Sequence, residues 1–185
     1  MSRFHMSAGA TALPPAGTDA SAMARGVVFV HACPRAMSPH LEWALAAVFG
    51  EPVQLAWSPQ FIAPTSVRGQ LSWTGPVGTG ARLTSALLPF AQVRFEITED
   101  AGAGRLGERF SCTPSLGLFR ADIGPHGDVM IPEDRLRAAI AQAAYAGTSL
   151  EEELARLIGQ PWDEELESFR SGQRDSTVRV LEQVI

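Results

Sequence analysis

The sequence predicts a single α+β domain in which two helices cover one face of a β-sheet. Two observations predict this fold class. Some segments alternate apolar with polar residues, as strands with one buried face do, and others repeat apolar residues every three or four positions, as amphipathic helices do. The second observation is the order of these segments, β-α-β-β-α-β across residues 26–98. That order is typical of the ferredoxin-like fold.

The first strand is predicted at residues 26–32, a continuous apolar run rich in β-branched residues, which is typical of a strand buried on both faces. A helix follows, since Leu41 and Leu45 recur at helical spacing and Gly50 ends the pattern.

Alternating residues predict two further strands, at 53–57 and 67–73. A glycine-rich turn at 75–80 leads into a second helix, whose apolar face extends over 83–90, and a fourth strand is predicted at 93–98. Each helix has one apolar stripe, as a layer of helices on one sheet face requires.

The remaining residues, 99–185, are predicted to form a hairpin and a helical extension of the same domain. The elements expected there are a loop at 99–109, a hairpin of 116–121 with 129–131 turned at 124–127, helices at 133–143, 150–158 and 162–169, and a strand at 177–181. The acidic run at 163–165 is interpreted as a solvated helix start.

Residues 1–24 lack a periodic apolar face and are predicted to be a disordered leader, so the domain spans 25–185. The formal net charge of −5 argues against sequence-independent nucleic-acid binding. Without a long apolar run or a secretory signal, no membrane association is expected and the cytoplasm is the default compartment. The two cysteines form no metal motif, and no cofactor is predicted.

Four residues around the end of the first strand are candidates for catalysis: His31, Cys33, His40 and Glu42. Imidazole, thiol and carboxylate groups bind zinc or transfer protons. Their spacing matches no metal motif, and His40 and Glu42 do not share a helix face. The alternative is that these residues are structural, with His31 hydrogen bonded at the strand end and Cys33 filling the core.

The glycine-rich turn is a candidate binding site for a small anionic ligand. Backbone amides at a strand-to-helix turn can converge on an anion, and the positive end of the helix adds to this. The predicted ligand-binding residues are Gly75, Gly78, Thr79, Gly80 and Arg82. The pattern is neither GxGxxG nor a P-loop, because the chain contains no lysine. The alternative is a tight turn followed by a helix cap.

Trp57 and Trp73 are predicted to end neighbouring strands and could form a stacking wall for that ligand, or belong to the core. The opposite, polar sheet face carries Arg68 and Arg94. It is expected to be a binding surface, to be solvated, or to be covered by the C-terminal helices.

Six segments resemble the DUF3145 family of high-GC Gram-positive bacteria. They are 25–31 (RGVVFVH), 39–45 (PHLEWAL), 73–82 (WTGPVGTGAR), 94–99 (RFEITE), 127–135 (GDVMIPEDR) and 161–166 (PWDEEL). The resemblance runs from about Arg25 to the C-terminus and implies no established activity. It does imply an association with fatty-acid or acyl metabolism, with an acyl-thioester, carrier protein or synthase as partner.

Three functions follow as hypotheses. The leading one is a non-catalytic binding or interaction module for a small anionic ligand or a protein partner. The second is a small enzyme that uses His31 and His40 as acid, base or metal ligand. The third is a structural subunit of a larger complex. Edge strands of such a sheet often pair between copies, so a homodimer is also considered.

Overall fold

The computed structural model describes residues 22–170 of the chain. The elements follow one another as β1 (Met23–Pro34), a 3-10 helix η1 (Arg35–Met37), α1 (Ser38–Phe49), β2 (Ser58–Pro59), β3 (Ser66–Pro76), α2 (Thr79–Leu87), β4 (Arg94–Glu99), β5 (Gly107–Thr113), β6 (Gly117–Ile123), β7 (Val129–Met130), α3 (Glu133–Ala146) and α4 (Leu150–Ile158). A last helix covers residues 160–170. The predicted α+β class is confirmed.

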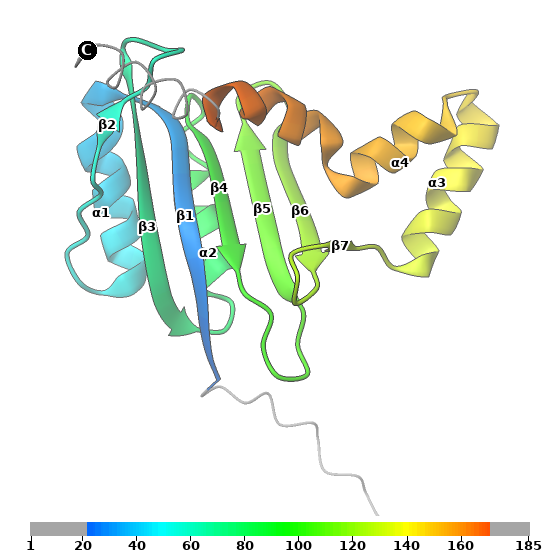
Figure 1. Cartoon of the computed structure of the whole chain (residues 1–185), viewed down its shortest axis with the longest axis horizontal. Coiled ribbons are helices and arrows are strands. Elements are labelled where there is room, and N and C mark those ends of the chain that lie inside the picture. Colours follow the sequence, from blue (N-terminus) through cyan, green and yellow to red (C-terminus); the bar gives the residue numbers. More distant parts are fainter. Residues whose placement is uncertain (1–21, 171–185) are drawn as a thin grey trace, which may run out of the picture.

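The strands form one sheet in the order β2-β3-β1-β4-β5-β6-β7, and every neighbouring pair is antiparallel. In Figure 1, α1 and α2 lie behind the sheet, whereas the last helix crosses its upper end. The helices α3 and α4 stand beyond the β7 side of the sheet.

The hydrophobic core lies between the sheet and the helices α1 and α2. Side chains with at most 1% exposure come from two strands and both helices. They are Val28 and Val30 of β1, Phe95 and Ile97 of β4, Leu41 and Leu45 of α1, and Leu83 and Leu87 of α2. Because side chains alternate along a strand, the residues between these core positions face the other side of the sheet. That second face carries the polar side chains.

The ferredoxin-like topology is not confirmed. Strand β1 does lie between β3 and β4 and is antiparallel to both, but the second strand of the expected pattern is reduced to the two residues of β2, and the sheet continues beyond β4 with β5, β6 and β7. The expected strand at 53–57 is absent. The backbone N–H of Leu55 and the indole Nε1 of Trp57 both donate to the Glu42 carboxylate, at 2.8 and 2.9 Å. These bonds hold the segment against α1, and only Ser58–Pro59 pair with β3.

Strand β5 was not predicted, since residues 99–109 were expected to be a loop. It pairs with β4 on one side and β6 on the other. Its polar residues Arg109, Ser111 and Thr113 do not face water but bond to other polar side chains of the protein. A strand is usually recognised by one apolar, buried face and one polar, solvated face, and β5 lacks this pattern. The predicted hairpin that follows is confirmed, because β6 pairs with β7.

The structured region begins slightly earlier than predicted. Strand β1 starts at Met23, two residues before the predicted domain boundary. The rest of the predicted leader and the predicted strand at 177–181 lie outside the described residues. Within residues 22–170, no helix has the length and apolarity needed to cross a bilayer.

Gly26 has no room for a Cβ between β1 and its neighbours, and we predict that Gly26→Ala destabilises the sheet. An added Cβ would lie 1.8 Å from the Thr98 carbonyl oxygen and 2.6 Å from Cζ2 of Trp73, so the strands must move apart. The expected loss of unfolding free energy in urea is about 3 kcal/mol. Gly102→Ala is the matched control, because an added Cβ there meets nothing closer than 3.7 Å. Equal stability of the two variants would contradict this packing argument.

Candidate functional site

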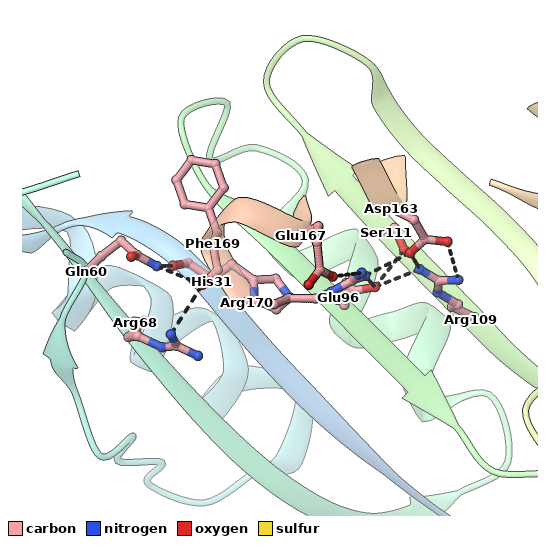
Figure 2. A network of polar contacts seen from close by, with 10 residues as sticks. All are labelled: His31, Gln60, Arg68, Glu96, Arg109, Ser111, Asp163, Glu167, Phe169 and Arg170. Carbon is pink, nitrogen blue, oxygen red and sulfur yellow. Dashed lines mark hydrogen bonds and ion pairs between the residues drawn. The ribbon is translucent and has the colours of Figure 1, made fainter. Parts of the chain in front are cut away.

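The polar face of the sheet carries a cluster of buried charges beneath the last helix. Side-chain alternation places His31 of β1, Glu96 of β4, and Arg109 and Ser111 of β5 on this face. The helix at 160–170 adds Asp163 and Arg170, and Figure 2 shows how these groups converge. We refer to these six side chains as the Glu96 network.

The Glu96 carboxylate is the centre of the network and accepts hydrogen bonds from four side chains. His31 Nε2 lies 2.7 Å from Oε2. Arg109 Nη2 and Ser111 Oγ donate to Oε1 at 2.9 and 3.2 Å. Arg170 donates to both oxygens, through Nη2 at 2.6 Å and Nε at 3.1 Å. This two-pronged contact is the geometry that favours arginine over lysine.

Asp163 shares both arginines with Glu96. Its carboxylate accepts from Arg170 Nη2 at 2.9 Å, and Arg109 donates to both of its oxygens. Carboxylates and guanidinium groups therefore alternate, so neighbouring charges in the network are opposite. Because Asp163 and Arg170 belong to the last helix, the network fastens that helix to β4 and β5.

Burial would raise the pKa of the Glu96 carboxyl, but the hydrogen bonds and positive charges of His31 and Arg170 outweigh it and hold the pKa well below its usual range. Burial acts on the pKa of Asp163 in the same way, and Arg109 and Arg170 lower it. Both carboxyl groups are therefore ionised at neutral pH.

Further contacts hold the same helix along its length. Glu165 accepts from Arg94 Nε at 3.2 Å and from Thr113 Oγ1 at 2.9 Å, and Leu166 is fully buried. The Trp162 and Phe119 rings lie 5.1 Å apart. The acidic run at 163–165 was predicted to be solvated, which is wrong for two of its members, because Asp163 and Glu165 face arginines of the sheet.

The last helix leaves uncovered a small hollow beside the network. Its volume is about 190 Å³, and it lies between β1, β3 and the segment before β3. Its apolar wall includes Phe29 and Ala56, while its polar lining comes from His31, Ser58, Arg68 and Gln70. Arg68 Nη1 also donates to the Phe169 carbonyl at 3.2 Å, which places the end of the last helix at the rim. Burial lowers the pKa of Arg68.

The structure does not bring the predicted catalytic residues together. His31 faces Glu96 on the polar side of the sheet, whereas α1, which carries His40 and Glu42, packs on the core side. His40 stacks edge-on against Trp43, with ring centres 5.0 Å apart. Glu42 serves as the acceptor for Leu55 and Trp57 described above. The helix that carries His40 therefore lies on the opposite side of the sheet from the His31 side chain.

The glycine-rich turn does bind a negative group, but that group belongs to the chain itself. The fully buried carboxylate of Glu99 accepts from the amide of Gly78 at 3.0 and 3.1 Å and from the amide of Gly80 at 2.9 Å. Arg105 Nη1 lies 3.1 Å from the same carboxylate. The premise of the ligand prediction, amides left open for an external anion, is therefore wrong at Gly78 and Gly80.

The other residues predicted at the turn are also engaged within the chain. The Thr79 hydroxyl donates to the Pro76 carbonyl at 2.6 Å and lies against Gly75. Arg82 Nη2 donates to the Val48 carbonyl at 3.2 Å. The alternative interpretation, a tight turn followed by a helix start, describes this segment better.

The two tryptophans do not form a shared wall. Trp57 lies against Gly69, and Trp73 lies against Gly26 in the core. Trp73 borders a different hollow, of about 310 Å³, in which Glu51 is the charged lining residue and disfavours an anion. The indole Nε1 of Trp73 is buried without a hydrogen-bond partner among the described residues.

The cysteines offer no reactive thiolate at neutral pH. Burial raises the pKa of Cys33 to about 11 and also raises that of Cys112. Within the described part of the chain, no three His, Cys, Asp or Glu side chains are grouped so that they could hold a metal ion.

Sequence reasoning named the polar face but assigned no organising role on it to Glu96, Arg109, Asp163 or Arg170. One pattern could have found two of them. Asp163, Leu166 and Arg170 recur at spacings of three and four and so share one helix face. A charged pair that flanks an apolar residue on one face indicates a helix docked on a surface of mixed charge.

Comparison with known proteins yields one family. The model of DUF3145, described as a protein of unknown function, matches residues 27–183 and so covers nearly the whole chain. No curated protein and no solved structure shows significant similarity to this chain.

We predict that Glu99→Gln destabilises the protein, because a neutral amide cannot accept from two backbone amides and Arg105 as the carboxylate does. The expected loss of unfolding free energy is about 2 kcal/mol. Asp100→Asn, a change at the exposed neighbouring residue, is the control and should stay within about 0.5 kcal/mol of the parent protein. A Glu99→Gln protein as stable as the control would refute the proposed role of Glu99.

The Glu96 network predicts a specific pH dependence. Because the folded-state pKa of Glu96 is depressed, its stabilisation is complete above the unfolded-state pKa of about 4.3 and is lost as the pH falls below that value. Glu96→Gln should cost about 3 kcal/mol at pH 7, and its difference from the parent protein should shrink at about pH 3. Urea unfolding at both pH values measures this. Glu51→Gln, at an exposed position, is the control, and a difference that does not change with pH would contradict the argument.

Proposed function

Because the chain belongs to the DUF3145 family, whose description assigns no activity, we propose a function from its surface: a non-catalytic module that binds a small carboxylate at the sheet-face hollow. The observation that carries the proposal is the two-sided lining of the hollow. Arg68, Gln70 and Ser58 can donate hydrogen bonds on one side, and Phe29 and Ala56 offer apolar contact on the other. Such a lining suits a carboxyl head on a short alkyl chain.

The volume of the hollow restricts the size of the ligand. Ligand sites for drug-sized molecules usually measure roughly 300 to 1,000 Å³. A hollow of about 190 Å³ suits a molecule of a few carbon atoms, such as a short-chain carboxylic acid or the acyl end of a longer group. This agrees with the link to acyl metabolism that the family resemblance implies.

A guanidinium at the hollow supports an anion there even though the chain is acidic overall. Four arginines, Arg68, Arg94, Arg109 and Arg170, lie on or against the polar face, and four acids, Glu96, Asp163, Glu165 and Glu167, offset their charge. Arg68 is the arginine among them that lines the hollow, whose described lining residues include no carboxylate. Arginine forks bind carboxylates with fixed orientation, so an arriving anion would meet a suitable group in Arg68.

Binding is proposed rather than catalysis because the His31 imidazole at the hollow is held by contacts within the protein. Nε2 of His31 lies in hydrogen-bond contact with Glu96, and the ring stacks on Phe29 with 9° between the planes. A general base must reach the proton that it takes from the substrate, and His31 is only 4% exposed. We propose that His31 forms part of the floor of the site.

Titration with sodium butyrate, followed by ¹H–¹⁵N NMR of the full chain at constant ionic strength, tests the proposal. We expect saturable shifts of amides in residues 29–31, 56–58 and 68–70, with a Kd on the order of 1 mM. Butyrate should bind more tightly than acetate, because its alkyl chain contacts Phe29 and Ala56.

Gln70→Ala should weaken butyrate binding about fivefold, since it removes one hydrogen bond to the carboxylate. Gln54→Ala is the matched control, because Gln54 is exposed and lines the other hollow. No shifts around the hollow at about 50 mM butyrate, or equal effects of the two variants, would overturn the proposal. Equal affinities for acetate and butyrate would instead favour an acidic side chain of a partner protein as the natural ligand.

A further inference from the structure

The helices α3 and α4 form a hairpin that stands apart from the sheet. They pack chiefly on each other, and Figure 1 shows them beyond the β7 side of the molecule. Within the hairpin, only Ala139 and Ala143 of α3 are buried, and α4 has no buried residue. Gly159 joins the hairpin to the last helix with a φ of +85°, against the Phe119 ring. We refer to the end near Gly159 as the base and to the turn between the helices as the tip.

The hairpin leaves several apolar side chains in water. Ile140 of α3 and Leu150 and Ile158 of α4 are about half exposed, although α4 has the apolar spacing of a helix that buries one side. None of these residues lines the groove between the two helices, which carries Arg135, Gln142, Glu153 and Arg156 among others. The exposed apolar residues therefore lie away from that polar groove, and such a face is normally covered by a partner.

The charges of the hairpin are opposite at its two ends. The tip carries Glu151, Glu152 and Glu153, and no basic residue occurs from position 138 to 155. The base carries Arg135, Arg137 and Arg156 together with the acids Glu133 and Asp134. The tip is strongly negative and the base is weakly positive. A surface whose two ends carry opposite charges is complementary to a second copy of itself that runs in the reverse direction.

We propose that two copies of this chain associate through their α3–α4 hairpins, antiparallel about a two-fold axis, as a four-helix bundle. A two-fold axis makes each contact occur twice, so the tip of each hairpin meets the base of the other. The apolar residues Leu150 and Ile158 of α4 then face each other between the hairpins, in the manner of other helical bundles.

Tyr145 supplies a specific anchor for this arrangement. Its side chain is 93% exposed near the tip, so it buries little surface against its own chain. At the base, a hollow of about 240 Å³ is lined by Arg120, Asp122, Met130 and Arg135 among others. In the antiparallel pair the Tyr145 ring of one copy reaches the partner's hollow. Guanidinium and thioether groups suit the ring, and Asp122 can accept from the hydroxyl.

Sedimentation equilibrium of the full chain tests the proposal. We expect a mass of twice 19.8 kDa at about 50 µM chain. Tyr145→Ala should weaken the dimer at least tenfold, since aromatic anchors dominate such interfaces. Trp43→Ala is the matched control, because Trp43 is 67% exposed on α1 and should leave the dimer unchanged. A monomer at every concentration, or a dimer that Tyr145→Ala does not weaken, overturns the proposal.

A charge-reversal experiment tests the antiparallel arrangement directly. The pair Glu151→Arg and Glu152→Arg reverses the tip, and the pair Arg135→Glu and Arg137→Glu reverses the base. Each double variant should be monomeric alone, because like charges then meet at both contacts. Mixed in equal amounts, the two should form a heterodimer, since both contacts are again complementary. If the mixture stays monomeric while circular dichroism shows both variants folded, the arrangement is wrong. The outcome is independent of butyrate binding, since the hollow at β1 and β3 lies across the sheet from the hairpin.

Discussion

Strand β4 carries a buried carboxylate on each face of the sheet, and both layers of the protein depend on this pair. Glu96 and Glu99 are three residues apart, so the alternation of a strand points them in opposite directions. Glu99 accepts from the amides of Gly78 and Gly80 and so holds the start of α2 on the core face. Glu96 accepts from Arg170 and holds the last helix on the polar face. One strand therefore sets the position of a helix on either side.

The Glu96 network contributes position more than net stability. A buried ion pair exchanged for well-packed apolar residues often leaves a protein equally stable, although removal of one partner alone is costly. In the last helix only Leu166 is fully buried among apolar residues, and an apolar contact of that size would let the helix slide. The forked bonds of Arg170 and Arg109 to Glu96 and Asp163 have one geometry that satisfies them all. The network therefore fixes the helix along the sheet.

Sequence patterns predicted the elements that pack on the apolar core. They missed the elements that are held by side chains distant in the sequence. Residues 26–32 and α1 pack against an ordinary apolar core, so their patterns predicted them correctly. The segment 53–57 alternates like a strand, yet its donors bind Glu42 of α1. The turn at Gly78 was predicted to bind an external anion, but its amides bind the carboxylate of Glu99 instead. The glycine-rich pattern indicated the donors, which are backbone amides. The acceptor, Glu99, could be assigned only from the structure, because the pairing of the strands places it beside the turn.

The last helix connects the two proposed surfaces, and the strength of its attachment determines whether they influence each other. It begins beside Gly159 at the base of the hairpin, and near its other end the Phe169 carbonyl accepts from Gln60 and Arg68 at the rim of the hollow. Coupling between binding sites is typically worth about 1–3 kcal/mol, whereas the loss of one partner of a buried charge pair costs about 3–5 kcal/mol. A shift of this helix would break several such contacts at once. The helix therefore acts as a fixed support, and we expect binding at the proposed hollow to be independent of association through the proposed hairpin surface.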